Sequence, residues 1–119
     1  MNIKVSFTRT QLEEIVHKIS VMIDDGTEDS IAGGYGFTDE TLDAFFLKFL
    51  PLHGKLRATV ELTPIEAEAV IGELDNAADI AASNVGDSGD EFDRARKSFQ
   101  DGILRVEHAQ YKAQHGEEA

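Results

Sequence analysis

Cysteine is absent from this chain of 119 residues. The absence excludes disulfides, thiolate zinc sites and cysteine nucleophiles, and it favours a cytoplasmic location without requiring one. No run of about 18 apolar residues is present, so the sequence predicts no membrane-spanning helix. The residues after Met1 include one lysine and no long apolar run, which is unlike a secretory signal peptide.

Basic residues are missing from a long central tract, because residues 58–93 contain no Lys or Arg. The tract holds ten acids: Glu61, Glu66, Glu68, Glu73, Asp75, Asp79, Asp87, Asp90, Glu91 and Asp93. The chain has a formal net charge of −12, so the other residues carry only −2, from 13 acids and 11 bases. Such acidity repels phosphate backbones and anionic lipids, so we expect a protein partner with a basic surface rather than nucleic acid or membrane. Acidity that serves only solubility is the alternative.

Size and patterning indicate one mainly helical α+β domain over residues 1–119. Apolar and polar residues alternate at about 3–7 and 56–62, which predicts two short strands. Each strand is followed by a capped helix and a further helix, so the predicted order is β-α-α-β-α-α, ending in a C-terminal helical hairpin. We expect the strands to pair antiparallel with the helices over one face.

Two helix starts have the Thr-x-x-Gln/Glu pattern of a capping box. Thr8 with Gln11 starts the first helix, and Thr63 with Glu66, aided by Pro64, starts the third. The two segments align at an offset of 55 residues. Shared local physics explains this weak repeat better than duplication, because few identities support it.

The segment at about 24–37 is acidic and glycine-rich, and we expect a flexible surface loop there. Tyr35 and Phe37 would serve as its anchor or as an exposed contact. No lysine follows its glycines as in a phosphate-binding loop. Thr38 caps the next helix, whose phenylalanines predict a buried core element that ends at Pro51.

The last helix carries acid-first pairs at i,i+4, such as Asp93 with Lys97 and Asp101 with Arg105, which describe a solvated face. We expect the chain to fray at about 112–119.

Patterns typical of catalysis or metal binding are weak in this chain. The acids at 87–93 do not match the spacing of a calcium-binding EF-hand loop. No nucleophile elbow is present, and no two of the four histidines have the spacing of a metal pair. The sequence therefore predicts a protein that is not an enzyme, with no catalytic residue, metal or cofactor.

The third helix carries the strongest candidate surface. Glu68, Asp75 and Asp79 fall near one line, roughly 10 and 6 Å apart along the axis at 1.5 Å per residue. We predict a partner-binding surface made of Glu66, Glu68, Glu73, Asp75, Asp79, Ile80, Asp87 and Asp90.

The predicted function is that of a non-enzymatic acidic interaction protein, such as an inhibitor that occupies the basic nucleic-acid-binding surface of its partner. In size and charge the chain is similar to phage anti-defence proteins of the anti-CRISPR type and to toxin immunity proteins. No motif carries this likeness, so it transfers no residue roles. A phage accessory protein of this kind would act in the cytoplasm of the host cell.

Two other functions stay open. The first is a homo-oligomeric assembly domain, joined through exposed strand edges or through the alanine stripe of the third helix. The second is a small-ligand binder that uses the 33–37 loop over the phenylalanine-rich helix.

Overall fold

The computed structural model of this chain describes residues 2–28, 30–83 and 90–115. It is mainly helical, with one two-stranded sheet, so the predicted α+β class is confirmed at that level. The elements are β1 (Ile3–Thr8), α1 (Arg9–Asp25), α2 (Ile31–Tyr35), α3 (Asp39–Phe49), the 3-10 turn η1 (Leu50–Leu52), β2 (Arg57–Leu62), α4 (Pro64–Ser83) and α6 (Asp90–His115). The predicted turn at 84–89 lies outside the described residues.

The two strands pair antiparallel, as predicted. Val5 lies opposite Val60, and Phe7 lies opposite Ala58. Alternation in the sequence becomes alternation in burial, because Ile3, Val5 and Phe7 face the core. On the other face Lys4 pairs with Glu61, and both are exposed to solvent.

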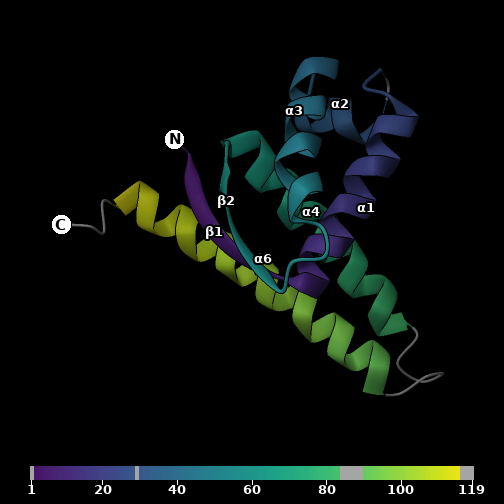
Figure 1. Cartoon of the computed structure of the whole chain (residues 1–119), viewed down its shortest axis with the longest axis vertical. Helices are drawn as coiled ribbons and strands as arrows, with labels where there is room; N and C mark the ends of the chain where they lie inside the picture. The colour runs from purple at the N-terminus through teal and green to yellow at the C-terminus, as the bar shows by residue number, and fades with distance from the viewer. Residues whose placement is uncertain (1, 29, 84–89, 116–119) are drawn as a thin grey trace.

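The helices cover the apolar face of the sheet. Figure 1 shows α6 running along β1, and the contacts join α6 to α4 and α1 to α3, the latter two standing together in the upper part of the view. The two longest helices, α4 and α6, form the most extensive contact. Alanines on α4, including Ala77 and Ala78, are buried and allow α6 to approach closely. The alanine stripe that the sequence offered for self-association is therefore used inside the monomer.

Aromatic rings fill the space between the sheet and α3. Phe7 of β1 packs on Phe49 with ring centroids 6.0 Å apart, and Phe49 meets Phe45 edge-on at 5.5 Å. All three side chains are buried, as the alternation of β1 predicts for Phe7 and the apolar pattern of α3 predicts for Phe45 and Phe49. The α-helix ends at Phe49 and is followed by the 3-10 turn η1, because Pro51 lacks the backbone N–H that a continuing helix would need.

Both predicted capping boxes have their reciprocal bond. Gln11 Oε1 accepts from the backbone N–H of Thr8 at 2.9 Å, and Glu66 Oε1 accepts from that of Thr63 at 3.0 Å. Gln11 reaches further than its local role requires, because its Nε2 donates to the carbonyl of Ser98 on α6 at 2.8 Å. The start of α1 is thereby tied to the C-terminal helix.

The segment at 24–37 differs from the expected irregular loop. The first helix runs on to Asp25 and stops at Gly26, whose φ of +78° lies in the left-handed region. The short helix α2 then forms and packs so closely that a Cβ on Gly33 would lie 2.0 Å from the carbonyl oxygen of Thr27. Ala32 is buried, so packing against the rest of the protein stabilises this short helix. The glycines at 33 and 34 predicted a loop there instead.

The C-terminal helix is longer than predicted, because α6 continues to His115 through four of the residues expected to fray. Its solvent-facing pairs are present: Asp93 binds Lys97 at 3.1 Å, and Asp101 binds Arg105 at 2.8 Å. Residues 116–119 lie outside the described part of the chain.

Candidate interaction surface

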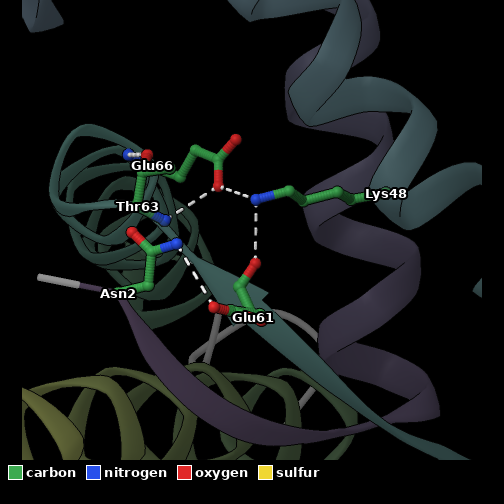
Figure 2. A network of polar contacts seen from close by, with 5 residues as sticks. All are labelled: Asn2, Lys48, Glu61, Thr63 and Glu66. Atoms are coloured by element: carbon green, nitrogen blue, oxygen red, sulfur yellow. Dashed lines mark hydrogen bonds and ion pairs between the residues drawn. The ribbon is translucent and has the colours of Figure 1, made fainter.

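The acidic helix α4 starts at a buried carboxylate. Glu66 sits in the first turn, where its side chain is only 5% exposed. Lys48 reaches across from α3 and places Nζ 2.5 Å from Glu66 Oε1 (Figure 2). Glu66 is therefore a structural residue, and its predicted place in the partner-binding surface is wrong. The sequence pattern located the cap but gave no sign that a lysine 18 residues earlier covers it.

Lys48 holds three elements together. Its Nζ also donates to the backbone carbonyl of Glu61 at 2.9 Å, so one ammonium group joins α3, the end of β2 and the start of α4 (Figure 2). The Glu61 side chain turns the other way and accepts from Asn2 at 3.2 Å. Lys48 therefore places a positive charge beside the start of the acidic tract at residues 58–93, which has no basic residue of its own.

Further along α4 three carboxylates point to solvent. Glu68, Asp75 and Asp79 are all exposed. Within the described residues none of the three forms a salt bridge. Because none of the three carboxylates is paired at salt-bridge distance in the described residues, their charges contribute a negative field in the solvent beside α4.

Glu73 lies on the flank of α4, roughly 140° around the helix from Glu68, and is half-buried. Its Oε2 accepts from the hydroxyl of Tyr35 at 2.9 Å. Burial raises the pKa of the Tyr35 hydroxyl, and the Glu73 carboxylate raises it further by favouring the protonated donor. Glycine at position 72 makes room for this contact, because a Cβ there would lie 2.2 Å from the Tyr35 oxygen.

The remaining predicted contact residues divide. Ile80 is 53% exposed on α4. Asp87 lies outside the described residues, and so does the side chain of Asp90. We define the acidic face of α4 as Glu68, Asp75 and Asp79.

Tyr35 and Phe37 anchor their segment to the core. Phe37 is buried and stacks on Phe45 with centroids 5.2 Å apart, and Tyr35 meets Phe37 edge-on at 6.4 Å. Phe37 is therefore no exposed contact. The space that a small ligand would need between this segment and α3 is occupied by the two stacked rings.

In the described part of the chain no three His, Asp or Glu side chains are grouped closely enough to hold a metal ion. None of the described helices combines the length and the apolar character needed to cross a bilayer. No family model, curated protein or solved structure matches this chain. The function must therefore be inferred from the charges and geometry of the acidic face.

Proposed function

We propose that this chain is a non-enzymatic interaction protein that binds a basic surface of a partner protein through the acidic face of α4. One observation supports the proposal above all: Glu68, Asp75 and Asp79 are exposed on one helix and have no salt-bridge partner among the described residues. Solubility alone does not require charges of one sign to gather on one helix.

A basic groove that normally holds nucleic acid is the partner surface with the best complementarity. Double-stranded DNA presents one charge per ~1.7 Å of axis, whereas the α4 acids are spaced by roughly 6 to 10 Å. The face is a sparse mimic, so steering of the encounter is its main electrostatic contribution. The inhibitor role, similar in character to phage anti-defence or immunity proteins, and action in the host cytoplasm belong to this proposal.

Capture from a host lysate tests the proposal. The wild-type chain is compared with the triple variant Glu68→Gln/Asp75→Asn/Asp79→Asn at low and high salt. The matched control is Glu40→Gln/Asp43→Asn/Glu107→Gln, which removes three exposed acids from α3 and α6 and gives the same net charge. We expect one basic partner that elutes with salt, that is lost with the α4 variant and that is retained by the control.

If both triple variants lose the partner equally, net charge alone explains the binding, and the proposal is contradicted. Recovery of the chain itself, resistant to salt, would favour the homo-oligomeric alternative. That alternative now has less support, because side chains already occupy part of both strand edges: Arg105 Nη1 donates to the carbonyl of Ser6 and Lys48 to that of Glu61.

A further inference from the structure

A cleft of about 230 Å³ opens between α1, α2 and α4, on the side of α4 that carries Glu73. Two carboxylates line it, Asp25 from the end of α1 and Glu73 from α4. Apolar side chains lie between the polar ones, notably Val21 and Ile31, which are 44% and 63% exposed. The cleft thus combines an apolar wall with acids from two different helices.

The charged groups that line the cleft differ in how many hydrogen-bond or salt-bridge partners they have. Lys18 is held in place, because its Nζ donates to the side-chain oxygen of Asn76 at 2.8 Å. Glu73 uses one carboxylate oxygen for the Tyr35 hydroxyl and has its second oxygen left for another donor. Asp25 is exposed and forms no salt bridge within the described residues. His17 completes the titratable lining of the cleft.

The size of the cleft selects among occupants. Pockets for small molecules usually measure roughly 300 to 1,000 Å³, so this one is small for a cofactor or metabolite. A single long basic side chain fits its chemistry, because the methylene stem packs on an apolar wall while the charged head reaches carboxylates. Arginine suits it better than lysine, since a planar fork of donors can bond two acceptors at once.

We infer that this cleft is the anchor site for one arginine side chain of the basic partner, an inference that rests on the proposed function. At about 100° per residue, Glu73 lies roughly 120 to 160° around α4 from Glu68, Asp75 and Asp79, so the cleft is on the flank of the helix. An arginine bound there would hold the partner at the side of the acidic face. Anchors in half-buried pockets carry most of the binding energy of an interface, whereas exposed charges mainly steer the encounter.

Titration of the isotope-labelled full chain with N-acetyl-arginine amide, followed by amide NMR shifts, tests the anchor. N-acetyl-citrulline amide is the neutral isostere of the probe. We expect the arginine probe, and not the citrulline one, to shift the signals of Val21, Ile31 and Asn76. In Asp25→Asn/Glu73→Gln the apparent Kd should rise by about tenfold or more, because two charged acceptors are lost. Glu40→Gln/Asp43→Asn, which makes the same change in charge at two exposed acids of α3 outside the cleft, should bind like the wild type.

Shifts that are absent up to the solubility limit of the probe would overturn the inference, as would shifts that are equal with citrulline or unchanged in Asp25→Asn/Glu73→Gln. Glutamine at 73 keeps an oxygen for the Tyr35 hydroxyl. If the double variant is unfolded, Asp25→Asn alone should weaken binding several-fold, because Asp25 is exposed and its replacement leaves the core intact. A partner captured by Asp25→Asn/Glu73→Gln as well as by the wild type, but lost in the triple α4 variant, would remove the anchor while the proposed function stands.

Discussion

Gln11 and Glu66 lie 55 residues apart and hold the same position in two copies of one arrangement. Each follows a strand, occupies the first turn of a helix, is buried, and accepts from the backbone N–H of a threonine three residues earlier. They are the two polar residues buried in the described part of the chain. The weak repeat in the sequence therefore corresponds to a repeat in structure.

The equivalence extends to contacts across the molecule. Gln11 of the first repeated segment is hydrogen-bonded to α6, which follows the second segment in the chain. Glu66 of the second segment is bonded to Lys48 of α3, which follows the first segment. The carbonyls of Ser6 and Glu61, also 55 residues apart, each accept from a basic side chain of that same helix, Arg105 and Lys48 respectively. Local capping physics alone does not require these reciprocal contacts.

Replacement of Lys48 by methionine should destabilise the protein by about 2 kcal/mol, because it leaves the buried Glu66 carboxylate without its cation. The value lies below that for a fully buried pair, since the Lys48 side chain is 32% exposed. Urea unfolding measures the difference. Lys55→Met, at an exposed lysine in the loop before β2, is the matched control and should change the free energy of unfolding by less than about 0.5 kcal/mol.

The double variant Lys48→Met/Glu66→Gln should recover part of the loss, because glutamine keeps an acceptor for the Thr63 N–H without the buried charge. A double variant that is less stable than Lys48→Met would show that the charge of Glu66 is not what makes Lys48 necessary.

Tyr35 should ionise only well above the ordinary tyrosine pKa of 10.0, because burial and the Glu73 carboxylate both oppose the phenolate. The chain has two tyrosines, so Tyr111→Phe isolates the signal of Tyr35 in a spectrophotometric titration. Adding Glu73→Gln should bring the midpoint back towards 10.0. Circular dichroism at each pH ensures that the folded chain is being titrated, and an unchanged midpoint in the glutamine variant would exclude the proposed cause.

Asp101 should stabilise the fold in a pH-dependent way. The hydrogen bond from Arg105 is the main cause that lowers the pKa of this carboxyl below its ordinary 3.8, with a smaller contribution from Gln11. The unfolded chain therefore takes up the proton first as the pH falls, so the stabilisation is complete above pH 3.8 and disappears as the pH drops through the lowered pKa. Asp101→Asn should cost about 0.3 to 0.5 kcal/mol near neutral pH, as expected for an exposed helix pair, and nothing in strong acid.

Chemical denaturation of the wild type and Asp101→Asn across this pH range checks the window. Glu107→Gln, at an exposed acid on the same helix without a salt bridge in the described residues, should show no such convergence. A gap between wild type and Asp101→Asn that stays constant into strong acid would contradict the assignment.

Gly72→Ala should lower the free energy of unfolding by about 1 kcal/mol, although alanine favours helices. Its Cβ would lie 2.2 Å from the Tyr35 oxygen and would force that ring away from Glu73. Gly34→Ala is the matched control, because nothing lies within 4 Å of the added carbon, and it should stabilise the helix by up to about 1 kcal/mol. Thermal melting ranks the two variants, and opposite signs are the expected result.

Local patterns predicted the parts of this fold that depend on near neighbours. The strand alternation, the two capping boxes and the stripe of α1 are all present within one or two residues. The same reasoning missed the features that depend on contacts between segments far apart in the sequence. Gly33 and Gly34 suggested a loop, yet contacts with the rest of the protein support α2 there.

The candidate surface shows the same division. Helical spacing placed Glu68, Asp75 and Asp79 together on an exposed face of α4. We predicted Glu66 beside these three acids as part of the same surface, because nothing near Glu66 in the sequence shows that Lys48 covers its side chain. The pairing of Tyr35 with Glu73 was missed for the same reason, and the glycine at 72 indicates only that another group approaches α4 closely at this point.

The bond from Gln11 to Ser98 has a consequence for the order in which a nascent chain folds. These residues are 87 positions apart in the sequence. The carbonyl of Ser6 likewise accepts a hydrogen bond from Arg105, which lies 99 positions later. While the ribosome is still making α6, the buried amide of Gln11 and the edge of β1 lack their final partners. Such long sequence separations slow folding, so we expect β1 to be the segment that chaperones protect for longest during synthesis.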